Sequence, residues 1–317
     1  MYNLCCISEE LKEQGYQFQT MTWKRFNQLL DQHGEYHALH ELGKRWLNNV
    51  HVTFYCVQHC YENGWGYRVS SSLFPIRTHP DFKYGIKNVP QYDEIMKGLE
   101  EIAIYNETWK VRLSTHPSQF VVLASENQSA VEKSIVDLNF HGWVMDKLGC
   151  PRDYNSPINI HVNCTKGDLA DIAARFMSNL NKCDHSVTSR LVLENEDKGC
   201  WTVANLLRYF YKDYLIPVTL DTLHFKCLNN GCFNETQAMV ACAKTWGMTK
   251  PLFHYSESHP DKTNPRSHAD MPTDCPPDFH ADFDIEIKQK CYAIRRCEEI
   301  RNARLSTDCP LPTEVEG

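Results

Sequence analysis

Residues 190–221 read RLVLENEDKGCWTVANLLRYFYKDYLIPVTLD, and this stretch contains one complete strand–helix–strand unit. A short run of branched aliphatic residues at 190–194 is typical of a buried strand. Apolar residues at helical spacing follow at 202–211, and a second β-rich run at 216–221 completes the unit. This order predicts two parallel strands joined by a helix, because a parallel connection needs a crossover segment.

The same alternation extends along the chain in both directions. Strands are predicted at residues 2–7, 67–71, 110–114, 158–162, 190–194, 216–221, 251–255 and 283–287. Helices are predicted at residues 39–61, 92–105, 129–148, 169–180, 202–211, 235–245 and 288–301, and 258–277 is predicted as a long loop. Eight such units predict the α/β class and a single TIM-type (β/α)₈ barrel over residues 1–302, followed by a loose tail at 303–317.

The composition is that of a folded globular chain. The 317 residues are 42% hydrophobic and 23% charged, which separates them from disordered sequences. No apolar run is long enough to cross a bilayer, and residues 1–8 lack the basic start and apolar core of a signal peptide. We expect a protein that is not secreted and has no membrane partner. We also expect a monomer.

The net charge of −7 differs from that of most nucleic-acid-binding proteins, which have a basic surface. It argues against long-range attraction to DNA. It does not exclude a DNA substrate, because bound divalent metal neutralises carboxylates and because Lys and Arg can cluster on one face.

The fifteen cysteines include no C-x-x-C pair, and their number is odd. Both features argue against a disulfide framework and against a thiolate zinc module. We interpret them as small, buried hydrophobic residues. This interpretation predicts a cytoplasmic or other reducing intracellular compartment.

Six consecutive predicted strands, the third to the eighth, end in a side chain that can bind metal. These residues are His116, His161, Glu194, Asp221, His254 and Glu286; His224 follows Asp221 by three positions, and His79 and His268 lie in the loops after the second and seventh strands. The carboxyl ends of barrel strands meet at one mouth, where such folds place their active sites. One terminal histidine is usually a hydrogen-bonded core residue. Six consecutive strands that each end in His, Asp or Glu favour a metal site, because carboxylates without metal would repel one another at the mouth.

So many donors exceed what one ion needs. Imidazoles and carboxylates suit borderline divalent ions such as Zn²⁺ and Mn²⁺, and two or three ions around a shared carboxylate suit phosphodiester hydrolysis. Glu194 is the natural bridging residue, and we predict catalytic roles for Glu194, His254 and Glu286. Glu196 and Asp197 lie further along and are interpreted as a solvated acidic loop.

Several blocks of this sequence resemble the UV damage endonucleases, over most of the chain from about residue 1 to 288. In order they are SLFPIRTHP (72–80), LSTHPSQF (113–120), NIH (159–161), LENED (193–197), LDTLH (220–224), FHYS (253–256), HA (268–269) and IEIK (285–288). A single block would be a weak signal, whereas all of them in this order are specific.

The resemblance implies a barrel related to endonuclease IV that acts on damaged double-stranded DNA. Such enzymes incise the backbone immediately 5′ of UV photoproducts without a nucleotide cofactor. The resemblance implies a cluster of two or three divalent ions, Mn²⁺ first, with Zn²⁺, Co²⁺ or Mg²⁺ as alternatives. By position, the implied ligands are His116, His161, Glu194, Asp221, His224, His254, His268 and Glu286, with His79 as a further ligand or a supporting residue.

The resemblance also implies that Gln119 and Phe120 contact the lesion. A planar ring that fills the gap left by displaced bases is physically reasonable; the alternative for Phe120 is a packed loop residue. The sequence departs from the family at Cys6, Glu10 and Leu252, and residues 11–36 are not matched to the family pattern. Cys6 and Glu10 stand where members often have Tyr and Asn facing the damaged DNA, and Leu252 stands where some have a modifiable lysine. The metal core therefore transfers better than the lesion preference.

Three other functions compete with this one. An abasic-site endonuclease of the same barrel class would use the same metal chemistry on a different lesion. A sugar isomerase on a related metal barrel would act on a small molecule, but such enzymes bind metal mainly through carboxylates, which the many histidines argue against. A non-catalytic DNA-binding module would not explain the ligand set.

Overall fold

The computed structural model describes residues 1–307, which contain eight parallel strands in one sheet. Their order in the sheet is β6-β5-β4-β3-β2-β1-β8-β7. The strands are β1 (Tyr2–Cys5), β2 (Gly66–Val69), β3 (Leu113–Thr115), β4 (Ile158–Ile160), β5 (Leu191–Glu194), β6 (Val218–Thr219), β7 (Leu252–Tyr255) and β8 (Asp282–Ile285). All eight predicted strands are confirmed, with bounds that differ by a few residues.

The sheet closes where its two end strands meet. Asp221, just past β6, pairs with His254 of β7 in a parallel bridge. The backbone N–H of His254 donates to the carbonyl oxygen of Leu220 at 2.8 Å. The predicted (β/α)₈ barrel is therefore confirmed, and its seam runs between β6 and β7.

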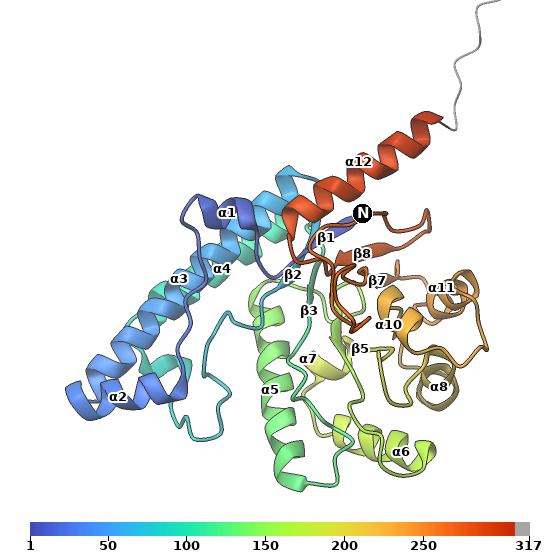
Figure 1. Ribbon diagram of the computed structural model, residues 1–317. Helices are drawn as coiled ribbons and strands as arrows, with labels where there is room; N and C mark the ends of the chain where they lie inside the picture. The colour runs from blue at the N-terminus through green and yellow to red at the C-terminus, as the bar shows by residue number, and fades with distance from the viewer. Residues whose placement is uncertain (308–317) are drawn as a thin grey trace, which may run out of the picture.

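Helices surround the strands, with α3 and α4 packed against each other on one side of the barrel (Figure 1). The long helices are α3 (Glu35–Glu62), α4 (Tyr92–Trp109), α5 (Gln128–Lys147), α6 (Leu169–Leu180), α11 (Glu235–Lys244) and α12 (Cys291–Thr307). The predicted helix at 202–211 consists of α8 (Val203–Leu206) and a π-helical turn, η2 (Leu207–Tyr211), and continues into α9 (Lys212–Tyr214). The predicted loop at 258–277 has no helix.

Several helical segments of the described residues were not predicted. They are α1 (Glu9–Glu13), α2 (Trp23–His33), the 3₁₀ turn η1 (Ile86–Asn88), α7 (His185–Thr188) and α10 (Thr222–Cys227). The capping signals were present: the side chains of Ser8, Thr22 and Asp221 accept from backbone N–H groups at the starts of α1, α2 and α10. Helix α12 continues to Thr307, past the predicted boundary at residue 302, and residues 308–317 of the predicted tail lie outside the described part of the chain.

The apolar face of α3 packs onto the sheet as its spacing predicts. Leu42, Trp46 and Val50 are fully buried. The face stays buried as far as Cys60, whereas Tyr61 is 39% exposed and its ring centroid lies 4.6 Å from that of Trp109. Burial of one large apolar side chain stabilises the fold by about 1.5–3 kcal/mol, so this face is a main anchor of the barrel wall.

The inside of the barrel, in contrast, is largely polar. The amide of Asn3 on β1 donates to Asp284 of β8 at 2.9 Å, and Arg68 of β2 pairs with both Asp284 and Glu286. Arg112, before β3, pairs with Asp282 at 2.9 Å nearer the opposite end. Buried charges need such partners. The contacts of Asn3 and Arg68 with Asp284 and Glu286 support the residues at the mouth.

The fourteen cysteines within residues 1–307 are free thiols, and only Cys232 among them is exposed. Their prediction as mostly buried, small residues is confirmed; Cys309 lies outside the described residues. No helix in the described part of the chain is both long and apolar enough to cross a membrane.

Candidate metal centre

Seven of the nine predicted ligands meet at the carboxyl ends of the strands. They form three groups whose ligand atoms lie within 4.8 Å of one another: His116, His161 and Glu194; Glu194, Asp221 and His224; and Asp221, His254 and Glu286. Glu194 belongs to two groups and Asp221 to two. The arrangement is a chain of three donor sets joined by two shared carboxylates.

Glu194, at the end of β5, is at the centre of this cluster. Its carboxylate oxygens lie 3.1 Å from His116 Nε2, His224 Nδ1 and His254 Nδ1, and 3.7 Å from His161 Nε2. Donor atoms that share one ion at metal–ligand distances of about 2.1 Å lie roughly 3 Å apart. The spacing around Glu194 is therefore that of a bridging ligand.

The pKa values show how charge is balanced in the cluster. Burial alone would raise the pKa of Glu194, but the charge of His254 and the hydrogen bonds of His116 and His224 hold it well below its usual range. Burial lowers the pKa of His161 to about 4, which keeps this ring neutral. For His224, burial acts in the opposite sense to the Asp221 and Glu194 carboxylates, which raise its pKa to about 11. The carboxylates thus attract positive charge, which a divalent cation supplies in full.

The donor set fits a divalent ion of the manganese or zinc type. Within residues 1–307, Asp221 Oδ2 is buried without a hydrogen-bond partner, and His254 Nδ1, 3.1 Å from Glu194, forms no well-aligned hydrogen bond. Buried polar atoms are rarely left in this state. Imidazole nitrogens and carboxylate oxygens without a thiolate are the ligands that such ions accept.

Residues behind the donors hold them in place, and sequence reasoning missed them. The Asn159 amide donates to Glu194. The Asp284 carboxylate lies 3.5 Å from His254 Nε2, on the far side of the ring from the cluster. Period-two alternation was an available signal, since Asn159 and Asp284 precede His161 and Glu286 by two positions and point to the same face of their strands.

Asn195 joins β5 to β6 beside the donors. Its side chain accepts from the backbone N–H of Asp221 at 2.8 Å and donates to the Asp221 carbonyl at 3.1 Å. Its own carbonyl oxygen lies 2.9 Å from His224 Nδ1. Asn195, the residue after Glu194, therefore supports the positions of Asp221 and His224.

Two of the predicted ligands lie outside the three groups. The ring of His79 stacks on Trp23, with centroids 4.8 Å apart and planes 21° apart. His268 Nδ1 is 2.6 Å from the carbonyl oxygen of Glu286, so its ring lies next to the end of β8. A histidine that donates Nδ1–H to a carbonyl keeps Nε2 free as an acceptor.

The loop after β3 carries the predicted lesion-contacting residues, and Phe120 is 79% exposed. Asn163, at φ 53°, holds this loop: its side-chain amide donates to the carbonyl oxygens of Gln119 and Val121, both at 3.2 Å. The backbone N–H of Asn163 donates to Glu196 at 2.8 Å. Glu196 is only 7% exposed, so its interpretation as a solvated residue is wrong. It turns inward to bond the neighbouring loop.

The three departures from the family pattern each have a structural role here. Cys6 has φ 69°, and its carbonyl accepts from the Tyr67 hydroxyl at 3.0 Å. Glu10 is occupied by two hydrogen bonds from Arg295, at 2.6 and 2.9 Å. Leu252 is buried in a small apolar cluster with Val192 and Trp246.

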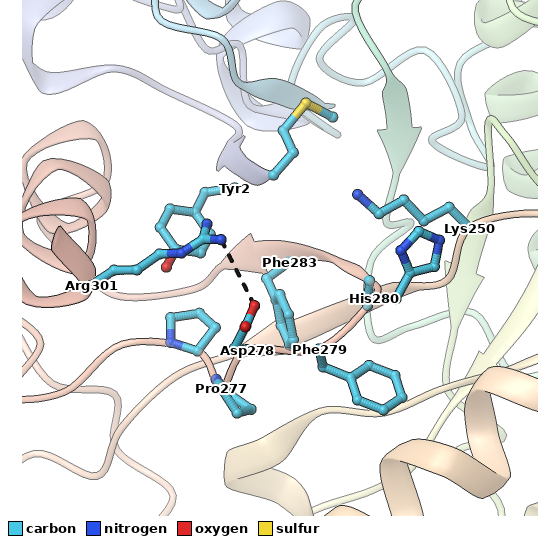
Figure 2. Close-up of a pocket in the computed structure, with 11 residues that line it drawn as sticks. Tyr2, Lys250, Pro277, Asp278, Phe279, His280, Phe283 and Arg301 are labelled. Carbon is cyan, nitrogen blue, oxygen red and sulfur yellow. Dashed lines mark ion pairs between the residues drawn. The ribbon is translucent and has the colours of Figure 1, made fainter. Parts of the chain in front are cut away.

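A cavity of about 370 Å³ lies at the opposite end of the barrel (Figure 2). Tyr2 and Phe283, from the starts of β1 and β8, line it, and an Arg301–Asp278 ion pair of 3.8 Å crosses it. The amino ends of barrel strands generally serve stability rather than catalysis. The three groups of clustered donors are at the other end.

The sequence is similar to several proteins named UV-damage endonucleases. It is 32% identical to a UV-damage endonuclease from Neurospora crassa over 74% of this chain and 38% of that protein. It is 31% identical to a UV-damage endonuclease from Schizosaccharomyces pombe over 79% of this chain and 42% of that protein. A Bacillus cereus UV DNA damage endonuclease is 28% identical over 79% of this chain and 75% of the relative. The chain spans about two fifths of the length of the fungal relatives.

Two solved structures share the fold. The crystal structure of SacUVDE matches with a TM-score of 0.78 at 24% identity, over 96% of this chain and 98% of that chain. Endonuclease IV from Thermus thermophilus matches with a TM-score of 0.54 at 15% identity, over 79% and 94%. The model of the family described as UV-endonuclease UvdE matches residues 2–309. With its barrel, its shared donor cluster and a match over nearly its whole length, this chain belongs to the UV-endonuclease UvdE family.

Proposed function

We propose that this protein is a metal-dependent endonuclease that incises duplex DNA immediately 5′ of UV photoproducts. The observation that carries the proposal is the cluster of seven donors in three groups joined by Glu194 and Asp221. A bound divalent cluster supplies an activated water and neutralises the charge on a phosphodiester and its leaving oxygen. The relatives named UV-damage endonuclease support the choice of substrate.

We further propose two or three ions, with Mn²⁺ as the native metal. Glu194 and Asp221 would bridge them, and His116, His161, His224, His254 and Glu286 would complete their shells. His79 and His268 lie outside the three groups. His268 would be a further ligand, and His79 a further ligand or a supporting residue. His161 is suited to bind metal at neutral pH because its low pKa, about 4, keeps the ring unprotonated.

The supporting residues fix the orientation of the ligands. A proton on His254 Nε2 would point to Asp284 at 3.5 Å, which leaves the lone pair of Nδ1 toward Glu194 and Glu286. Arg68 balances the charge of Asp284 and Glu286 from below. These contacts hold the donors ready before DNA arrives, and preorganisation of this kind is a large part of catalysis.

Lesion contact is proposed for Gln119 and Phe120. Phe120 is 79% exposed. Two hydrogen bonds from Asn163 hold the loop that carries it. Such a ring can occupy the space that damaged bases leave when they are displaced from the stack. The free thiols support action in a reducing compartment.

A nicking assay tests the proposal. Duplexes of one sequence carry a single photoproduct, a single abasic site or no lesion, and the products are mapped to the nucleotide with and without Mn²⁺. We expect a metal-dependent cut immediately 5′ of the photoproduct and an intact undamaged duplex. Cleavage restricted to the abasic duplex would replace the proposal with an abasic-site endonuclease.

A further inference from the structure

A groove of about 700 Å³ lies on the outer wall of the barrel, away from the metal centre. It is bounded by α4, α5 and the segment around η1, and none of the seven clustered donors lines it. Its lining residues include three cations and three aromatic rings: Arg77, Lys87, Lys147, Tyr92, Phe140 and Trp143. Among the described residues that line it, none is acidic.

The three cations lack acidic partners. Within residues 1–307, no ion pair is formed by Arg77, Lys87 or Lys147. Arg77 is half-buried, and its Nε is buried without a hydrogen-bond partner. Burial of a cation is costly when nothing balances it. In a chain of net charge −7, a groove with three unbalanced cations is suited to an anionic ligand.

The aromatic side chains add a second type of recognition. Phe140 and Trp143, one turn apart on α5, lie nearly parallel at 13° with centroids 5.5 Å apart. The Arg77 guanidinium lies 5.1 Å from the Phe140 centroid, and the Lys147 ammonium lies 5.9 Å from that of Trp143. Rings with adjacent cations bind ligands that have both a flat apolar face and a negative charge.

The groove is joined to the metal-bearing side of the barrel through one short segment. Arg77 precedes His79 by two residues, in the loop after β2. The hydroxyl of Thr78, between them, donates to Asp137 of α5 at 2.7 Å and fixes the segment against that helix. The loop after β2 therefore carries both Arg77 of the groove and His79 of the predicted ligand set.

We propose that this groove binds single-stranded DNA, with phosphates at Arg77, Lys87 and Lys147 and a base against Trp143. The strand is single because bases in a duplex are already stacked and cannot present a face to an aromatic side chain. The inference uses the proposed function only in taking DNA as the partner. It adds a second contact surface to the one at the metal centre.

Fluorescence anisotropy tests this with a fluorescein-labelled thymidine octamer and the intact, metal-loaded protein. Trp143→Ala should weaken binding by at least about fivefold, the lower limit for loss of one stacked base. Trp143→Phe should keep most of the affinity, because the ring remains. Lys147→Glu should also weaken binding, whereas Lys133→Glu, an exposed lysine of α5 outside the groove, should leave it unchanged.

An octamer of abasic residues separates stacking from charge. The wild type should bind it more weakly than the thymidine octamer, and Trp143→Ala should weaken it no further. Equal binding of the two octamers by the wild type would overturn the proposal, as would an equal loss in Lys133→Glu and Lys147→Glu. If Trp143→Ala does not fold, Lys147→Glu and the two octamers still decide.

Nicking is measured in parallel on a blunt duplex with one photoproduct, which has no single-stranded extension. The groove variants should cut it at the wild-type rate. Octamer binding with the expected pattern but no nicking would overturn the proposed function and leave the groove intact. Nicking without octamer binding would overturn the proposed groove and leave the proposed function intact.

Discussion

Asp221 and His254 close the barrel and also belong to one donor group. Their backbones form the parallel bridge at the seam between β6 and β7. Their side chains meet Glu286 within 4.8 Å. A metal held there would connect the two end strands of the sheet, so we expect metal binding and barrel closure to be coupled.

Metal removal should therefore lower the melting temperature. Binding to the native state alone stabilises by about 2.7 kcal/mol at a hundredfold excess over Kd, and scanning calorimetry should show a drop of several degrees after chelation. In Asp221→Asn the drop should be smaller, because the seam keeps its backbone hydrogen bond but loses a charged ligand. An equal drop in both proteins would contradict the coupling.

Glu194→Gln should abolish nicking. The substitution preserves shape but removes the charge that faces four histidines, so the rate should fall by orders of magnitude and the bound metal, measured by mass spectrometry, should decrease. Glu132→Gln, at an exposed position of α5, is the matched control. Full activity in Glu194→Gln would rule out a bridging carboxylate.

Phe120→Ala should separate lesion contact from chemistry. Stacking is worth about 1–3 kcal/mol per base, and each factor of ten corresponds to about 1.4 kcal/mol. Incision of a photoproduct duplex should slow by roughly 10- to 100-fold, while metal content and melting temperature stay at wild-type values. His161→Ala, in comparison, should lose metal and activity on every substrate. A wild-type incision rate in Phe120→Ala would show that Phe120 does not contribute to lesion contact.

Asn163→Ala should loosen the loop that presents Phe120. The variant loses both side-chain hydrogen bonds to the carbonyls of Gln119 and Val121, each worth about 0.5–1.5 kcal/mol. Chymotrypsin should then cut after Phe120 several times faster than in the wild type. Asn302→Ala, on the exposed surface of α12, provides the comparison. Identical cleavage rates in all three proteins would mean that the loop is held by other contacts.

Reductant should leave the protein unchanged. The cysteines within residues 1–307 are free thiols, so calorimetric melting curves with and without dithiothreitol should coincide. Nicking rates measured under the same two conditions should also agree. A large destabilisation by reductant would reveal a disulfide and a different compartment.

The alternation of strands and helices, and the metal-type residues at the ends of six strands, determined the barrel and the end that carries the donors. Parallel strands share one carboxyl edge, so His116, Glu194 and Glu286 could be assigned to one mouth from local pattern alone. Helices such as α2 escaped prediction because a single cap such as Thr22 is a weak local signal.

Tertiary structure alone decided how the donors are shared. Whether an imidazole reaches Glu194 depends on register and closure between strands far apart in the chain, which no local pattern encodes. The same is true of His79, which stacks on Trp23 outside the three groups, and of Glu196, which turns inward to Asn163. Local sequence sets which side of a strand a residue faces, but only the closed barrel sets the distances across its mouth.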